Sequence, residues 1–192
     1  MAEQYNNSQL FNPLVASAES LGKSISKVEQ ANKANVANSF SNVRGIATGK
    51  MVNPDINKLG TITTPYQGST NYEKVHPGVD IANVAGTPIP AFTSGKVVEE
   101  VTGQGWTPNN PSFGNYIVIQ DNNGNYQRYS HLQNAFVKVG DTISKGTELG
   151  TMGGTGSTYG ANANQPGIHL DYRIYDAAKK YYDPFQYLSN AK

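Results

Sequence analysis

The apolar positions near the start of the chain follow a helical period. Between residues 14 and 44 they recur mostly every three or four residues, which gathers them on one narrow face of a helix. These positions are Leu14, Ala18, Leu21, Ile25, Val28, Val36, Phe40 and Val43. Because a lone helix cannot bury such a face against itself, we expect residues 14–44 to dock on this chain's own C-terminal part, on a second copy or on a larger assembly. The alternative is a loosely ordered tail that aids solubility.

The pattern changes to alternation with a period of two after Thr61. Short runs rich in Val, Ile and Tyr, separated by turn residues, predict strands. The predicted strands cover residues 96–101, 116–119, 126–129, 149–152 and 168–174. Asn123-Gly124 stands between two of these runs and predicts a tight hairpin. The sequence therefore predicts a mainly β fold with antiparallel sheets, with an N-terminal helix and linker over residues 1–58 and the β domain over residues 59–192.

Composition narrows the classes of function. The chain has 192 residues, of which 37% are hydrophobic and 15% charged, and it contains no cysteine. The lack of cysteine excludes a disulfide scaffold, a thiolate zinc finger and a cysteine nucleophile. A formal net charge of +1 gives no electrostatic attraction to nucleic acid, and no apolar run is long enough for a membrane-spanning helix. Residues 1–20 lack the basic and apolar regions of a secretory signal peptide.

The three histidines of the chain all lie near carboxylates or at the end of a predicted strand. His76 precedes Asp80 across a Pro-Gly turn. His169 and Asp171 are two residues apart on a predicted strand, so both side chains point to the same face, and His131 ends another strand. Imidazole and carboxylate are ligands of catalytic zinc, which uses three protein ligands and one water. The pattern indicates a metal site, although an isolated His-x-Asp pair is more often structural than ligating.

Four segments in the second part of the chain carry a family resemblance. They are, in order, HPGVDIANVAGTPIPAFTSGKVV, GNYIVIQDNNGNYQRYSHL, VKVGDTISKGTELGTMGGTGS and GIHLDYRI. Over residues 60–188 the chain resembles the LytM/lysostaphin-type zinc endopeptidases. The resemblance implies an antiparallel β fold with a groove over the sheet, one zinc ion, and hydrolysis of peptide bonds in bacterial peptidoglycan.

The resemblance also implies roles for individual residues. His76 and Asp80 correspond to the first two zinc ligands of the family, and Asp171 stands where the family has its third ligand, a histidine. His131 and His169 correspond to two non-ligand histidines that position the attacking water, accept its proton and stabilise the oxyanion. The sequence leaves open which of these two histidines is the base.

Aspartate at position 171 is the one departure from the family's ligand set. A carboxylate binds zinc, and its oxygens reach about as far from Cβ as Nδ1 of histidine but less far than Nε2. A second carboxylate weakens the Lewis acidity of the ion and admits manganese or another divalent metal. Three interpretations follow: an active enzyme with an unusual ligand set, a metal site without turnover, or a domain that only binds. We expect the active enzyme, because both non-ligand histidines are present.

Two further features bear on substrate and setting. Tyr72 is a candidate donor to the oxyanion, and Thr102–Phe113 is a candidate wall of the groove, with strand packing and an ordinary surface loop as the alternatives. With its predicted docking helix and without a signal peptide, the chain resembles tail-associated peptidoglycan hydrolases of bacteriophages. We therefore expect a virion component that acts on the host wall during phage entry, with other virion proteins as partners. The alternatives are an endolysin, an extracellular or wall-associated enzyme exported by another route, and a LytM-like module that is structural or binds the wall without cutting.

Overall fold

The chain consists of two compact units. The computed structural model describes residues 20, 23–27, 29–30, 49–103, 113–158 and 167–190, and the chain divides into the units Met1–Arg44 and Gly45–Lys192. In the first unit the described residues are helical and exposed, and Ile25 is 53% exposed. The other positions of the predicted apolar face lie outside the described residues. Docking of residues 14–44 therefore stays a prediction.

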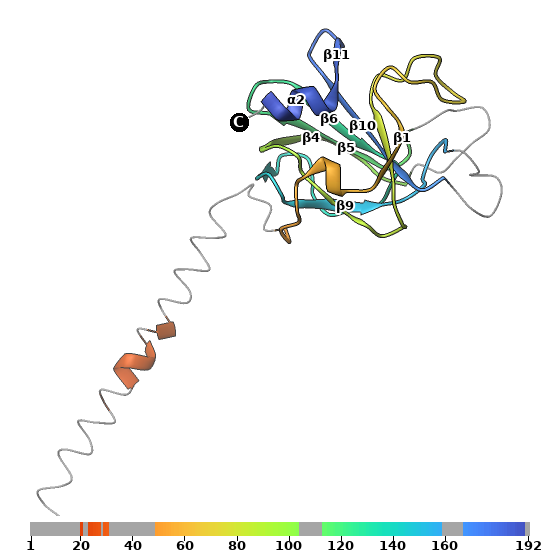
Figure 1. Cartoon of the computed structure of the whole chain (residues 1–192). Helices are drawn as coiled ribbons and strands as arrows, with labels where there is room; N and C mark the ends of the chain where they lie inside the picture. Colours follow the sequence, from red (N-terminus) through yellow and green to blue (C-terminus); the bar gives the residue numbers. More distant parts are fainter. Residues whose placement is uncertain are drawn as a thin grey trace, which may run out of the picture. The chain divides into compact units, whose positions relative to one another are not determined.

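Strands dominate the second unit, which confirms the predicted mainly β fold (Figure 1). In the described residues the elements are η1, a 3₁₀ helix (Ile56–Lys58), β1 (Thr61–Thr64), β2 (Val79–Ala82), β3 (Pro88–Pro90), β4 (Gly95–Val101), β5 (Tyr116–Asp121), β6 (Tyr126–Ser130), β7 (Leu132–Ala135), β8 (Thr142–Ile143), β9 (Glu148–Met152), β10 (His169–Tyr175), β11 (Tyr181–Tyr182) and α2 (Pro184–Asn190). The five predicted strands are present as β4, β5, β6, β9 and β10.

These strands form two antiparallel sheets. Within the described ranges, the larger sheet has the order β1-β2-β10-β6-β5-β4-β8, with β11 paired to β10, and the smaller sheet has the order β3-β9-β7. The predicted hairpin joins β5 to β6, and the Gly124 amide donates a hydrogen bond to the Asp121 carbonyl oxygen at 2.9 Å. Gly124 has a φ of 83°, which glycine adopts without steric cost.

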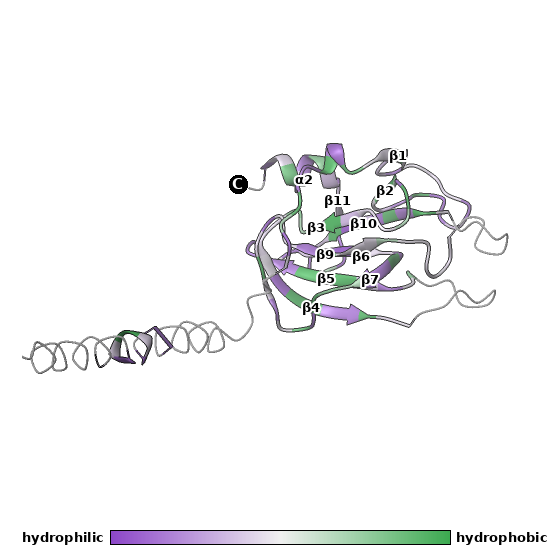
Figure 2. Ribbon diagram, turned by 90° about the horizontal axis from the view of Figure 1, so that it is seen from below, coloured by the Kyte–Doolittle hydropathy of each residue, from purple (hydrophilic) through white to green (hydrophobic). Residues whose placement is uncertain are grey.

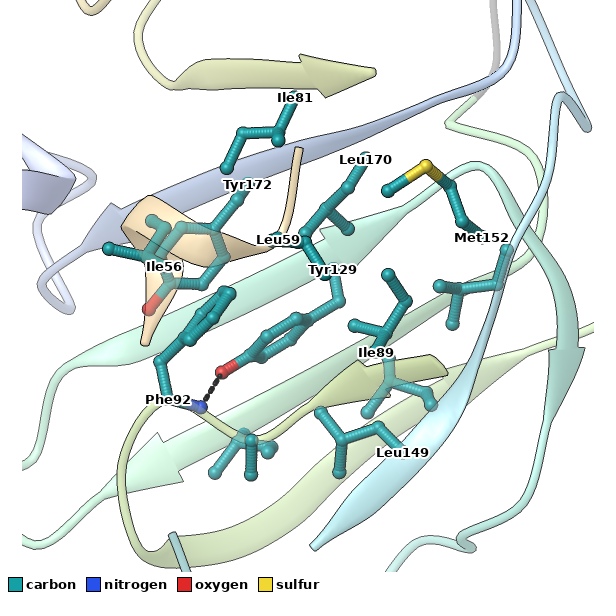
Figure 3. Close-up of a cluster of buried hydrophobic side chains, with 14 of the residues drawn as sticks. Ile56, Leu59, Ile81, Ile89, Phe92, Tyr129, Leu149, Met152, Leu170 and Tyr172 are labelled. Atoms are coloured by element: carbon teal, nitrogen blue, oxygen red, sulfur yellow. Dashed lines mark hydrogen bonds between the residues drawn. The ribbon is translucent and has the colours of Figure 1, made fainter. Parts of the chain in front are cut away.

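One hydrophobic core joins the two sheets (Figure 3). The rings of Tyr129 on β6 and Tyr172 on β10 lie 4.9 Å apart between centroids, and both contact the ring of Phe92. The Tyr172 hydroxyl donates to Gln127 Oε1 at 2.6 Å, and the Phe92 amide donates to the Tyr129 hydroxyl oxygen at 3.0 Å. The smaller sheet contributes Ile89, Leu132, Leu149 and Met152. The tyrosines thus combine apolar burial with satisfied hydroxyl groups.

Residues just before β1 also belong to this core. Ile56 and Leu59 are buried in it, and Met51 forms an isolated β-bridge with Thr147. These residues lie in or next to the stretch that the sequence placed in a linker. Part of that stretch therefore packs on the β body.

The helix α2 packs on the same body at the other end of the sequence. Its residues Phe185, Tyr187 and Leu188 contact the core, and the Tyr187 hydroxyl donates to Asp121 Oδ2 at 2.6 Å. None of the helices in the described residues is long and apolar enough to cross a membrane.

Alternation along the strands separates the core from the other face of the larger sheet. On β5, which is green in Figure 2, Ile117 and Ile119 belong to the core cluster and lie two residues apart. On β10 the core-facing residues are Leu170, Tyr172 and Ile174. Because side chains alternate across a strand, His169, Asp171 and Arg173 share the opposite face. The core therefore holds β10 in the register that presents these three side chains together.

Candidate metal centre

Three neighbouring elements bring the predicted ligands together. His76 lies in the loop that leads into β2, Asp80 lies on β2, and Asp171 lies on β10. The two strands pair with Asp171 directly opposite Asp80. Directly opposed residues of an antiparallel pair share one face of the sheet. The register therefore sets the two carboxylates side by side.

The ligand atoms of these residues converge. His76 Nε2 lies 3.1 Å from Asp80 Oδ1 and 3.7 Å from Asp171 Oδ1. One such atom from each residue lies within 4.8 Å of the others, and all three residues are buried. The aspartate at position 171 therefore reaches the cluster in spite of its short side chain.

The cluster fits a zinc ion. Ligand atoms about 2.0–2.2 Å from a tetrahedral ion lie roughly 3.4 Å apart, close to the spacing found. His76 Nε2 and Asp80 Oδ1 are buried, and neither has a hydrogen-bond partner among the described residues. Because a buried polar atom without a partner is costly, a cation between them would relieve both.

Gly78 allows the loop that carries His76 to approach β10 closely. A Cβ atom at this position would lie 2.6 Å from the Tyr172 carbonyl oxygen and 2.6 Å from Arg173 Cγ. Gly78 is not among the described residues with positive φ. Glycine is therefore required here by close packing and not by a left-handed backbone.

Glu73 and Arg173 adjoin the cluster and are not among the site residues predicted from the sequence. Glu73 Oε2 lies 2.8 Å from His76 Nδ1, and Arg173 donates to both oxygens of Glu73 at 2.8 and 2.9 Å. Arg173 Nε also lies 2.8 and 2.9 Å from the two oxygens of Asp171. The period of two on β10 could have indicated Arg173. Glu73 lies in a loop, where no periodic signal exists.

His131 and His169 lie beside the cluster, with 4.7 Å between their ring centroids. His131 Nδ1 lies 2.7 Å from the Thr155 carbonyl oxygen, and His169 Nδ1 lies 2.8 Å from the Gly167 carbonyl oxygen. Because a carbonyl only accepts hydrogen bonds, each Nδ1 carries a proton, and in the tautomer that this bond selects Nε2 is the acceptor. His169 Nε2 is 3.8 Å from Asp80 Oδ1, so this acceptor faces the cluster.

Burial and neighbouring charges set the protonation of these groups. Burial, assisted by His169, lowers the pKa of His131 to about 4, so this ring is neutral at neutral pH. Burial alone raises the pKa of Asp171, but the Arg173 guanidinium outweighs it and brings the pKa to about 2. Burial lowers the pKa of His76, yet the neighbouring carboxylates outweigh that effect and the net shift is upward. Asp171 is thus ionised and ready to bind a cation.

The predicted site residues line one groove of about 760 Å³. Tyr72 and Phe113 also line it. Tyr72 is 57% exposed, and its hydroxyl oxygen lies 3.5 Å from the Thr158 carbonyl oxygen, so its role as an oxyanion donor stays a prediction. Most of Thr102–Phe113 lies outside the described residues, and its role as a groove wall stays a prediction as well.

The fold and the cluster agree with a peptidase family. Residues 74–184 match the model of Peptidase family M23. The match covers more than half of the chain, and the chain belongs to Peptidase family M23. It includes all five predicted site residues.

Relatives and solved structures agree with this assignment. Peptidoglycan DD-endopeptidase ShyA of Vibrio cholerae is 38% identical over 99 residues, which are 52% of this chain and 20% of that protein. Lysostaphin of Staphylococcus simulans is 34% identical over 119 residues, which are 61% of this chain and 22% of that protein. The chain thus spans about a fifth of the length of these relatives. The structure of lysostaphin from Staphylococcus simulans has a TM-score of 0.54 at 29% identity and covers 74% of this chain and 54% of that one.

A second solved structure, that of LytU, supports the same fold. It has a TM-score of 0.54 at 28% identity, and the match covers 69% of this chain and 87% of that chain. Both structures therefore agree with the antiparallel LytM/lysostaphin-type fold expected from the sequence.

Proposed function

We propose that this chain is a zinc-dependent endopeptidase that hydrolyses peptide bonds in bacterial peptidoglycan. The observation that carries the proposal is the convergence of His76, Asp80 and Asp171 in a groove, with His131 and His169 beside them. Membership in Peptidase family M23 supports the reaction class. The similarity to ShyA, whose name is peptidoglycan DD-endopeptidase, supports the substrate class. The similarity to lysostaphin, an antimicrobial peptidase, supports the reaction class as well.

Three residues would hold the zinc ion: His76 through Nε2, and Asp80 and Asp171 through one oxygen each. When bound, zinc supplies Lewis acidity toward the scissile carbonyl and the attacking water. Two carboxylates donate more negative charge than one carboxylate with an imidazole, so this acidity is weaker than in a His-Asp-His site. The same oxygen-rich ligand set also admits manganese.

His131 and His169 would handle the proton. Their Nδ1–H groups are fixed by backbone carbonyl oxygens, so each ring offers Nε2 as the acceptor. An acceptor in this place orients a water by taking its hydrogen bond and takes its proton during attack on the carbonyl. The imidazolium that results donates a hydrogen bond to the oxyanion and then transfers its proton to the leaving amine nitrogen as the C–N bond breaks. Which of the two rings acts as the base stays open.

Metal analysis and wall digestion test the proposal. Purified protein is stripped with a chelator and reloaded, and we expect one zinc ion per chain and loss of turbidity of purified cell walls, with new free amino groups. His76→Ala and Asp80→Asn should lose both zinc and hydrolysis. His131→Asn should keep zinc and lose about 10²–10⁴-fold in rate. Stoichiometric zinc without digestion would favour the alternative of a non-catalytic wall-binding module.

We also propose a virion setting, in which the chain rides on a phage tail and acts on the host wall during entry. The exposed Ile25 on a helical segment supports a docking role for residues 14–44, with other virion proteins or a second copy as the partner. Antibodies against the chain should label the tails of purified particles of the phage that encodes it. Labelling confined to the envelope of uninfected cells would contradict this setting.

A further inference from the structure

A continuous chain of charge-assisted hydrogen bonds runs behind the ligand cluster. It passes from His76 Nδ1 to Glu73 (2.8 Å), from Glu73 to both terminal nitrogens of Arg173 (2.8 and 2.9 Å), and from Arg173 to the carboxylate of Asp171 (2.8 to 2.9 Å). The side chains of His76, Asp171 and Arg173 are 2%, 3% and 6% exposed. The Glu73 side chain is 33% exposed, so water competes little for the bonds between Arg173 and Asp171 and more for those of Glu73. Charge-assisted bonds of this kind are the strong ones.

We infer that Glu73 and Arg173 are positioning residues for the metal centre. They direct His76 Nε2 and Asp171 Oδ1 toward the same metal position, so that a carboxylate serves as the third ligand. This inference rests on the proposed zinc site. It explains how an aspartate stands where the family resemblance places an imidazole. The short side chain is held in place by a guanidinium two residues further along the same strand.

The contacts of Arg173 fix the rotation of the Asp171 carboxylate. Arg173 Nη2 lies 2.8 Å from Asp171 Oδ2, while Nε contacts both oxygens. Oδ2 is therefore held twice by the guanidinium, and Oδ1 is the oxygen that lies 3.7 Å from His76 Nε2. The terminal torsion of an aspartate is otherwise broad. A planar guanidinium fork restricts it in a way that a flexible ammonium does not.

Glu73 fixes the other ligand. An ionised carboxylate only accepts hydrogen bonds, so the contact with Nδ1 places the imidazole proton there and leaves Nε2 of His76 for the metal. Partners of this kind orient ligands, and their loss typically costs about 10–100-fold in metal affinity. Because Glu73 binds Arg173 through both oxygens as well, the two ligand residues are held through one shared connection.

The surroundings hold Arg173 in this position. Gly78 brings the loop before β2 against Arg173 Cγ, where any larger residue would collide. The Phe113 ring covers the guanidinium, with 5.0 Å between the ring centroid and Cζ. Arg173 is thus packed on several sides, and its fork is presented to Asp171 and Glu73 in one orientation.

Zinc affinity of the full chain, measured by competition with a chromophoric chelator, tests the inference without using activity. Arg173→Gln and Arg173→Lys should each bind zinc about 10–100-fold more weakly than the wild type. Lysine keeps the charge but cannot bridge two carboxylates through a fork. Wild-type affinity in folded Arg173→Lys or Arg173→Gln would overturn the inference.

Two other variants guard against loss of folding and against a general charge effect. Glu73→Gln changes a partly exposed residue, so it should remain folded while losing about tenfold in zinc affinity. Unchanged affinity would overturn the role of Glu73.

Arg128→Gln is the matched control, because Arg128 lies directly opposite Arg173 and stacks on Phe113 at 3.3 Å. Its Nε and Nη2 have no hydrogen-bond partner in the described residues. This control removes a positive charge from the same face of the sheet, but within the described ranges no hydrogen bond joins Arg128 to a ligand residue. It should therefore stay within about threefold of the wild type, and a loss as large as that of Arg173→Gln would overturn the inference.

A double-variant comparison shows whether Arg173 acts through Asp171. In an Asp171→His background, Arg173→Gln should weaken zinc binding by a smaller factor than in the wild type, since the Asp171 carboxylate is gone and only the contact of Arg173 with Glu73 remains to be lost. An equal loss in both backgrounds would overturn the inference. The visible spectrum of the cobalt-substituted protein should also change in Arg173→Lys and stay unchanged in Arg128→Gln, because it reports ligand geometry.

The outcomes separate this inference from the proposed function. Zinc binding and wall hydrolysis by the wild type, with unchanged affinity in the Arg173 variants, would overturn the inference alone. Zinc binding without hydrolysis, with weakened affinity in the Arg173 variants, would overturn the enzymatic proposal and support the inference.

Discussion

The carboxylate of Asp171 reaches the ligand cluster because three local features coincide. Its strand pairs in register with β2, so it lies directly opposite Asp80. Arg173 holds its two oxygens, and Gly78 lets the loop of His76 come close. None of these features concerns the length of the aspartate side chain itself. At the residue scale, a substitution that shortens a ligand is compensated by its neighbours.

Asp171→His tests this compensation. We expect zinc to remain bound and wall hydrolysis to be kept or raised, because an imidazole leaves the ion a stronger Lewis acid than a carboxylate does. The unfolding free energy of the metal-free protein should fall by about 1–3 kcal/mol, since the buried Arg173 loses an acceptor. Chelator competition, turbidity assays and urea unfolding measure the three effects. Loss of zinc binding would contradict the placement of residue 171 in the cluster.

The buried ring of His131 should make the metal-free protein less stable in acid. Its pKa of about 4 lies below the ordinary 6.5, so between these values the unfolded chain binds a proton that the folded chain does not. Stability from this group is complete above pH 6.5 and declines as the pH falls toward 4, by up to about 3 kcal/mol. His131→Asn removes this titration, and asparagine tolerates the φ of 64° at this position.

Urea unfolding of wild type and His131→Asn over this pH range measures the effect. As the pH falls from 6.5 toward 4, the unfolding free energy of the wild type should decrease more than that of His131→Asn. A difference that does not change with pH would contradict the low pKa of His131.

At the scale of elements, strands long enough to show a period were predictable from sequence. The runs that became β4, β5, β6, β9 and β10 each extend over five to seven residues. By contrast, β8 and β11 have two residues each and β3 has three, which is too short for any alternation to be recognised. Pairing with longer neighbours, and not their own sequence, defines these strands.

The core side of β10 should control stability while the other side controls chemistry. Leu170→Ala deletes a fully buried side chain and should cost about 2–5 kcal/mol of unfolding free energy, measured by urea titration. Zinc stoichiometry should be retained, because Leu170 faces away from the cluster. Lys96→Ala on the exposed face of β4 is the control and should stay within about 0.5 kcal/mol of the wild type. Equal losses in both variants would contradict the assignment of the core.

At the scale of the whole molecule, the site joins distant parts of the chain. Glu73 and Arg173 are 100 positions apart and form a two-bond ion pair. Residue types and strand alternation could indicate that His76, Asp80 and Asp171 carry chemistry, and the family resemblance supplied their common site. Neither the residue pattern nor the family resemblance indicated Glu73, because its contacts depend on a loop conformation that no sequence period encodes. The three residues of the candidate metal cluster were thus predictable from the sequence, and Glu73 and Arg173 beside them were not.

The β unit should be independent of the N-terminal segment. All described site and core residues lie within Gly45–Lys192. Deletion of residues 1–44 should therefore leave the thermal midpoint within about 2 °C and zinc affinity within about threefold of the full chain. Calorimetry and chelator competition measure both. A shortened chain that fails to fold would contradict the division into two units.

The direct opposition of Asp80 and Asp171 has a practical consequence for handling the protein. Like charges that face each other across two strands weaken the pairing of the strands. A divalent ion bound by both carboxylates would remove this repulsion and link β2 to β10. Preparations kept in EDTA would then lose shelf life as well as turnover. Purification and storage buffers that contain a trace of zinc would preserve the sheet itself.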